Sequence, residues 1–129
     1  MTITELELPF PPSELSPNDR KHWANKQDAK KQFKHDCYFM ACTKRPNYTK
    51  ETGIILIFHP PDGIHRDLDN MLASMKYGLD MVADAWKIND RLFRPHFQDW
   101  GPIHKPFGKV RLIACGKHEF VPVLTSLGY

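Results

Sequence analysis

Residues 53–59, Gly-Ile-Ile-Leu-Ile-Phe-His, constrain the fold of this 129-residue chain more than any other segment. The apolar residues of this run are continuous, and three of them are the β-branched residue Ile. Such a run is typical of a strand that is covered on both faces, whereas a half-exposed strand alternates polar and apolar residues. We therefore expect a central strand here, and the rest of the chain must supply the layers that cover it.

The next segment, residues 67–86, contains the clearest helical pattern. Its large apolar residues recur at spacings of 4, 3, 4, 3 and 4, which places them on one stripe of a helix. These residues are Leu68, Leu72, Met75, Leu79, Val82 and Trp86. A second helix is expected from about Arg20 to Lys44, with an apolar face that starts at Trp23, because this segment contains no Pro or Gly and Pro46 ends it.

Three further segments have the composition of strands: residues 2–8, 93–100 and 109–115. The resulting order, β-α-β-α-β-β, predicts an α+β (mixed α/β) fold with two main helices packed on one mixed sheet. The length predicts a single small domain over residues 1–129. Residues 117–129 show no strong pattern, and we expect them to form a loosely ordered tail.

Composition excludes several classes of protein. The chain is 41% hydrophobic and 26% charged, which is typical of globular rather than disordered or fibrous proteins. No apolar run approaches the roughly 20 residues that span a bilayer, and the first residues do not resemble a signal peptide. We therefore expect a cytoplasmic protein with no membrane partner. Cys37, Cys42 and Cys115 lack C-x-x-C spacing, which indicates reduced, packed thiols rather than disulfides or a zinc site.

Positive charge is concentrated in residues 18–50, which contain nine Lys and Arg residues against three Asp. Residues 51–100 reverse this balance, with eight acids against five bases. A basic segment beside an acidic one is expected for a phosphate-binding surface around a metal centre, and an ordinary solvated helix face is the alternative. The candidate DNA-binding residues of the basic segment are Arg20, Lys21, Lys30, Lys31 and Lys34.

Asp67 and Asp69 stand between the loop after the apolar strand and the start of the best helix. Two carboxylates two residues apart can converge on one Mg²⁺ ion. A helix N-terminus repels cations, so a third acid would help, and Asp90 is the candidate because it follows the helix. The alternative is that Asp67 only caps the helix and Asp69 is a first-turn acid.

Basic residues flank these acids. Lys76 lies within about 20° of Asp69 in helical projection and ~10 Å further along the axis. Its side chain leans back toward the acids, although a surface pair with Asp80 explains it equally well. His65 and Arg66 directly precede Asp67 and are candidate phosphate contacts at the rim of the site.

The segment Arg66-Asp67-Leu68-Asp69-Asn70, its helix and Asp90 resemble the RusA family of Holliday junction resolvases. The opening strand that runs into Leu8-Pro9-Phe10-Pro11-Pro12-Ser13 resembles the same family, so that the likeness covers about residues 3–115. The resemblance implies a homodimeric, Mg²⁺-dependent endonuclease, with Mn²⁺ as a substitute, that nicks four-way DNA junctions symmetrically in recombination and repair. It further implies a prophage-type protein of a bacterial or phage-infected host cell.

The resemblance implies metal-binding roles for Asp67, Asp69 and Asp90, and it places Arg66 and Asn70 in the same site. One position departs from the family pattern, because Ala73 stands where many members carry a catalytic lysine. Lys76, one turn further along, is the proposed substitute. Two alternatives remain, a non-cleaving branched-DNA binding protein with a degenerate site and a phosphohydrolase that acts on small nucleotides.

Overall fold

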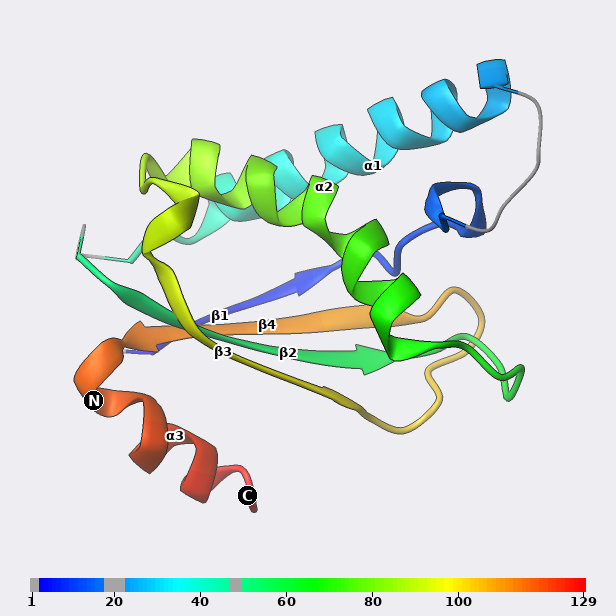
Figure 1. The fold of residues 1–129 in the computed structure, drawn as a ribbon. Coiled ribbons are helices and arrows are strands. Elements are labelled where there is room, and N and C mark those ends of the chain that lie inside the picture. The colour runs from blue at the N-terminus through cyan, green and yellow to red at the C-terminus, as the bar shows by residue number, and fades with distance from the viewer. Residues whose placement is uncertain (1–2, 18–22, 47–49) are drawn as a thin grey trace.

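The computed structural model describes residues 3–17, 23–46 and 50–129, and it has an α+β fold with one mixed sheet (Figure 1). The strands are β1 (Ile3–Leu8), β2 (Thr52–His59), β3 (Phe93–Trp100) and β4 (Lys109–Gly116), and the helices are α1 (Trp23–Thr43), α2 (Leu68–Trp86) and α3 (Phe120–Ser126). The predicted order of strands and main helices is confirmed. Within the described ranges, none of the helices is both long and apolar enough to cross a membrane.

The sheet has the order β1-β4-β2-β3, and β2 is the central strand that the apolar run predicts. Residues 52–58 of β2 are all buried. β2 pairs antiparallel with β4 and parallel with β3, and α2 forms the crossover between the two parallel strands. As a result, the segment that leaves β2 and the segment that enters β3 lie at opposite edges of the sheet.

Helices α1 and α2 cover one face of the sheet, and α3 lies on the other face (Figure 1). Trp86, near the end of α2, donates from Nε1 to the carbonyl oxygens of Ala41 at 3.0 Å and Lys44 at 2.8 Å. The expected apolar face of α1 is only partly correct, because Trp23 is 72% exposed and the buried face starts at Phe33. The N-terminal turns of α1 lie away from the sheet, which explains the difference (Figure 1).

Close packing between the two helices depends on Gly78 of α2. A Cβ atom at this position would lie 2.8 Å from Cys37 Sγ and 3.0 Å from Phe33 Cε2. The buried face of α2 is therefore centred on this contact, and Leu68, Leu72 and Leu79 of the predicted stripe are only partly buried. Helix α1 thus decides which part of the stripe becomes core.

The prediction of a loosely ordered tail is wrong for residues 117–126. A 3-10 turn, Lys117–Glu119, leads into α3, whose Phe120 and Val123 are buried. They pack against the outer face of the sheet, together with Ile55, Ile57, Ile113 and Cys115. A seven-residue helix with two buried anchors is too short to produce a periodic sequence signal, so the docking surface on the sheet decides its conformation.

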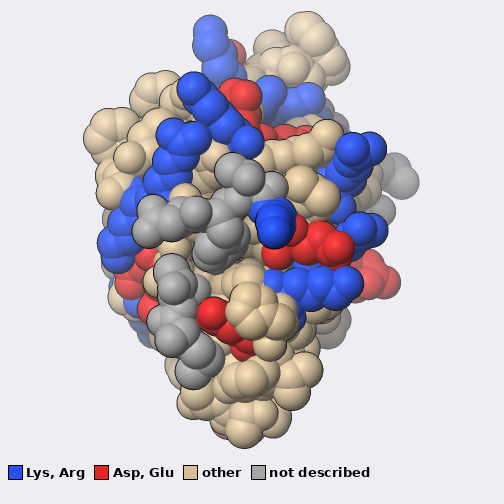
Figure 2. All heavy atoms as spheres, turned by 90° about the vertical axis from the view of Figure 1, so that its left-hand side faces the viewer, with Lys and Arg blue, Asp and Glu red and all other residues tan. Residues whose placement is uncertain are grey.

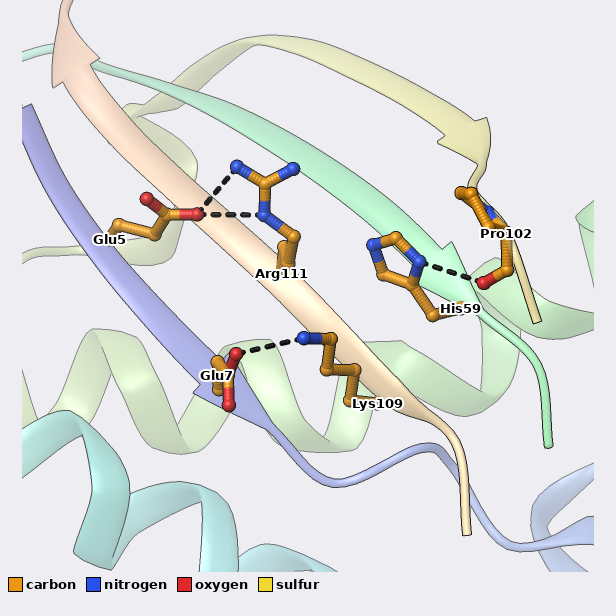
Figure 3. Close-up of polar contacts among 6 residues, drawn as sticks. All are labelled: Glu5, Glu7, His59, Pro102, Lys109 and Arg111. Atoms are coloured by element: carbon orange, nitrogen blue, oxygen red, sulfur yellow. Dashed lines mark hydrogen bonds and ion pairs between the residues drawn. The ribbon is translucent and has the colours of Figure 1, made fainter. Parts of the chain in front are cut away.

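The outer face of the sheet carries two charge pairs beyond the area where α3 packs (Figure 3). Glu5 of β1 pairs with Arg111 of β4 at 2.7 Å, and Glu7 pairs with Lys109 at 2.9 Å. The hydrogen bond and the positive charge of Lys109 lower the pKa of the Glu7 carboxyl. These cross-strand pairs give β1 and β4 a polar outer face.

The three cysteines are free, as expected, but they are not all packed. Cys37 and Cys115 are buried, whereas Cys42 is exposed. Burial raises the pKa of the Cys37 thiol to about 12 and that of Cys115 to about 11. Both buried thiols are therefore protonated and unreactive at neutral pH.

The packing of α3 yields a stability prediction at Gly53. A Cβ atom at Gly53 would lie 2.3 Å from Cδ1 of Phe120, so Gly53→Ala must displace this ring. We expect the substitution to lower the free energy of unfolding by about 1–3 kcal/mol, measured by urea denaturation. Gly63→Ala is the matched control, because its nearest neighbour would be Ile103 Cδ1 at 3.9 Å. Equal urea midpoints for the two variants would contradict the proposed role of Gly53.

Candidate functional site

A cleft of about 690 Å³ lies at the edge of the sheet where β2 ends. β1, β2 and β3 run in the same direction, since β1 and β2 are both antiparallel to β4 and β3 is parallel to β2. Their exit segments therefore meet at one edge, where open sheets commonly bind ligands. The cleft is lined by Phe10, Pro11, Pro12, Ser13, Ser16, Pro61, Ile64, His65, Arg66, Asp67, Asn70, Met71, Ser74 and Phe107.

Asp67 caps α2 and also lines the cleft. Its Oδ1 accepts a hydrogen bond from the backbone N–H of Asp69 at 3.0 Å, and its carbonyl oxygen accepts from the N–H of Met71 at 3.0 Å. The capping interpretation of Asp67 is therefore confirmed. The cap occupies only Oδ1 and leaves Oδ2 without a hydrogen bond to any described residue, so the same carboxylate can still bind a cation.

Arg66 is held in place by the loop that precedes Asp67. Its Nη1 donates to Asp62 Oδ1 at 2.9 Å and to the carbonyl oxygen of Ile64 at 3.1 Å. Its guanidinium carbon lies 5.4 Å from the centre of the Phe10 ring, within cation–π range. The hydrogen bonds from Arg66 and from the Ile64 N–H lower the pKa of the Asp62 carboxyl. Arg66 thus joins the loop after β2 to the proline-rich segment after β1.

The remaining predicted residues near the start of α2 occupy different surfaces. His65 and Asn70 line the cleft, and the carbonyl oxygen of Asn70 accepts a hydrogen bond from Ser74 Oγ at 3.0 Å. Asp69 is exposed on the first turn and lies outside the lining of the cleft. Lys76 is exposed further along α2, and it forms no ion pair with Asp80, both residues lying in the described part of the chain.

Asp90 does not join Asp67 and Asp69 within one chain, contrary to the expectation from sequence. It lies in the 3-10 turn Asp90–Leu92, after the C-terminal end of α2. The 19 residues of α2 extend over about 28 Å at 1.5 Å per residue, and the crossover carries the chain to the opposite edge of the sheet. Among the described residues, no three Asp, Glu, His or Cys side chains are close enough together to hold a metal ion.

The edge of the molecule that contains Asp90 is rich in charge (Figure 2). Glu51 Oε2 accepts from Arg94 Nε at 2.9 Å and from Lys117 Nζ at 3.1 Å. These two hydrogen bonds lower the pKa of the Glu51 carboxyl, and the bond from Lys117 has the larger effect. At this edge Glu51 is therefore paired with one basic side chain from β3 and one from the turn before α3.

The basic residues of α1 form a second hollow beside α2. Lys30, Lys31 and Lys34 line it together with Met81 of α2. Lys30 Nζ lies 4.5 Å from the centre of the Tyr77 ring, and Tyr77 is ~12 Å along the helix from Asp69. The α1 lysines therefore lie in the same layer of helices as Asp69, about two turns further along α2. Arg20 and Lys21 lie outside the described residues.

Sequence reasoning missed two contributors to the cleft. No site residue was predicted in the proline-rich segment, yet its Phe10 and Ser13 line the cleft. Phe107 forms part of the rim, although residues 101–108 carry no periodic pattern. The feature that could have identified these segments is the direction of the strands. Because β1, β2 and β3 run the same way, the loops that follow them lie at the same edge of the sheet.

No family model matches this chain. An uncharacterized protein of Xylella fastidiosa is 37% identical over 101 residues, which cover 73% of this chain. The match spans 65% of the length of that protein. This similarity identifies a related chain without indicating an activity.

The dual position of Asp67 yields a prediction that separates its cap from its charge. Asp67→Ala removes the hydrogen bond to the Asp69 N–H and should lower the free energy of unfolding by about 0.5–2 kcal/mol. Asp67→Asn should stay close to the parental stability, because Asn is an equally good cap. Urea denaturation measures both variants. Equal losses in the two variants would show that the charge of Asp67, rather than its cap, supports the fold.

Proposed function

We propose that this chain is a Mg²⁺-dependent, structure-specific endonuclease of the RusA type that cuts four-way DNA junctions by paired nicks. One observation carries the proposal. The two motifs that resemble this family, Phe10-Pro11-Pro12-Ser13 and Arg66-Asp67-Leu68-Asp69-Asn70, lie far apart in the sequence but meet at the same cleft. A shared function at the cleft explains why both segments have these residues.

The donor atoms at this edge fit a hard cation. Mg²⁺ binds through one or two carboxylates and completes its shell with water and phosphate oxygens. Asp67, through its free Oδ2, and the exposed Asp69 would hold it, and Mn²⁺ would bind the same oxygen donors. A bound Mg²⁺ supplies a polarised phosphate and a water of lowered pKa.

Neighbouring side chains would position the scissile phosphate. Arg66 is fixed by Asp62 and Ile64 through Nη1, and its other nitrogens can donate to phosphate oxygens. Asn70 presents an amide to the cleft. Lys76, on the same helical face as Asp69, would reduce the negative charge that develops on the phosphate.

Two symmetric cuts require two active sites, and a homodimer with two-fold symmetry provides them. The dimer also gives Asp90 a route to the metal. Because α2 separates Asp90 from Asp67 within one chain, Asp90 takes part in cleavage only if a second copy presents it. The proposed cellular role is recombination or repair of DNA in a bacterial or phage-infected cell.

A non-cleaving branched-DNA binding protein is the second candidate. The observation that favours it is the separation of Asp90 from the other acids, since the described residues contain no group of three metal ligands. The basic hollow of α1 fits this candidate as well as it fits a nuclease. Cleavage therefore has to be measured separately from binding.

The first prediction of the nuclease proposal concerns the acids. The parental protein should cut a labelled four-way junction in Mg²⁺ or Mn²⁺, but not in EDTA, and should leave a linear duplex of the same sequence intact. Asp67→Asn and Asp69→Asn should abolish cleavage while junction binding persists, because both remove metal ligands and Asn preserves the cap at position 67. Lys76→Ala should slow single-turnover cleavage about ten-fold.

Asp80→Asn, on the same helix, is the matched control and should cut at the parental rate. Asp90→Asn should be inactive alone, and mixing it with Asp67→Asn should restore activity to one site of the mixed dimer if Asp90 acts from the second copy. A parental protein that binds the junction but leaves it uncut in both metals would replace the nuclease with the non-cleaving candidate.

A second prediction concerns the lysines of α1. Junction affinity should fall steeply with salt, because each neutralised phosphate releases counterions with a slope of about 0.9 in the log–log plot. Replacing Lys30, Lys31 and Lys34 together by Gln should flatten this slope by up to about 2.7. Replacing Lys44, Lys50 and Arg111 by Gln removes the same charge from residues that line neither the cleft nor the α1 hollow and serves as control. Equal slopes for the two triple variants would assign the α1 lysines to an ordinary solvated face.

A further inference from the structure

We infer that Phe107 is a base-stacking residue that takes an unpaired nucleobase of the DNA strand bound in the cleft. This inference rests on the proposed function and adds a means of recognising the branch point. Phe107 is 84% exposed and is the most exposed large hydrophobic side chain among the described residues. It lines the same cleft as Arg66, Asp67 and Asn70.

The loop that carries Phe107 is anchored to the end of β2. The N–H of Gly101 donates to the carbonyl oxygen of Phe58, and the N–H of His104 donates to that of Pro60, both at 2.8 Å. His59 Nδ1 hydrogen-bonds the carbonyl oxygen of Pro102 at 2.9 Å (Figure 3). A third backbone bond, from the N–H of Gly108 to the carbonyl oxygen of His104 at 2.8 Å, closes the loop on itself.

Gly108 fixes the exit from this loop. Its φ is +72°, a conformation that favours glycine, and a Cβ there would lie 2.8 Å from the carbonyl oxygen of His59. The absence of a Cβ at Gly108 thus lets the loop beside Phe107 pack closely against His59 and Pro61. A large apolar side chain that is held in water by an anchored loop is available to a ligand at little conformational cost.

The chemistry around Phe107 favours a nucleobase as that ligand. His65 and Arg66 line the same cleft, and His104 and Lys105 of the loop are exposed, so the cleft and the loop both present cationic or polar groups. Aromatic rings set among phosphate-binding groups are the combination that binds single-stranded nucleic acid. Apolar residues such as Phe10 and Ile64 share the cleft, and a protein partner bound there would leave DNA binding by Phe107→Leu unchanged.

Stacking on Phe107 would discriminate branched from linear DNA. The bases of a continuous duplex are stacked on their neighbours and cannot reach a side chain without unstacking, which costs a few kcal/mol per step. A base at a branch point has already lost a neighbour, so its face is accessible. Phe107 would thus strengthen binding to junctions and single strands more than binding to a duplex.

The test measures binding in EDTA, where cleavage cannot occur, with a four-way junction, a single strand and a linear duplex. Phe107→Leu keeps an apolar side chain but removes the ring, and it should weaken binding of the junction and the single strand by about 5- to 150-fold. Duplex affinity should not change. Phe107→Tyr should bind like the parental protein, because it retains the aromatic face.

Val121→Ala on α3 is the control at an exposed apolar residue outside the cleft. Val121 is 68% exposed and does not line the cleft. This variant should bind all three DNAs like the parental protein. A 2-aminopurine base at the branch point provides an independent readout, since its fluorescence should be quenched by the parental protein and by Phe107→Tyr but not by Phe107→Leu.

The outcomes separate this inference from the proposed function. If the parental protein cuts junctions in Mg²⁺ and Phe107→Leu binds all three DNAs normally, the stacking role is wrong and the nuclease stands. If the parental protein cuts nothing but Phe107→Leu loses single-strand binding, the stacking role stands and the nuclease is wrong. Absence of binding to any of the three DNAs by the parental protein would overturn both.

Discussion

The parallel pairing of β2 with β3 is the constraint on which the rest of the structure depends. Two parallel strands cannot be joined by a tight turn, so the chain must cross the sheet between them, and α2 is that crossover. Burial of β2 on both faces requires a layer of helix over the sheet. Helix α2 supplies this layer by packing its apolar side against the sheet. The start and the end of α2 are thereby fixed at opposite edges.

The same pairing assembles the cleft. β1, β2 and β3 all end at one edge, so the segments that leave them supply the walls, and Arg66 joins two of these segments by contacting both Asp62 and Phe10. At this edge the N-terminus of α2 carries a partial positive charge. The Asp67 carboxylate counters this charge and accepts a hydrogen bond from the backbone N–H of Asp69. One residue thus stabilises the helix and presents a carboxylate oxygen to the cleft.

The charged residues of β1 and β4 are paired, whereas, among the described residues, the three lysines of the α1 hollow are not. Across β1 and β4, Glu5 and Glu7 are neutralised by Arg111 and Lys109, and such pairs contribute little beyond local order. Lys30, Lys31 and Lys34 form no ion pairs within the described residues, and Lys30 instead lies over the Tyr77 ring. A cluster of unpaired cations attracts phosphate more strongly than paired charges do, which is consistent with a role for α1 in DNA binding.

The sequence by itself determined the features that arise from local periodicity. The apolar run of β2, the stripe of α2 and the cap at Asp67 each depend on residues close together in the chain, so spacing alone predicts them. Tertiary structure decided the rest. Phe120 becomes core only because Gly53 leaves room for its ring, and Asp90 is separated from Asp67 because the crossover ends at the far edge of the sheet. Neither outcome is encoded in local spacing, since each depends on where the chain path places residues that are distant in sequence.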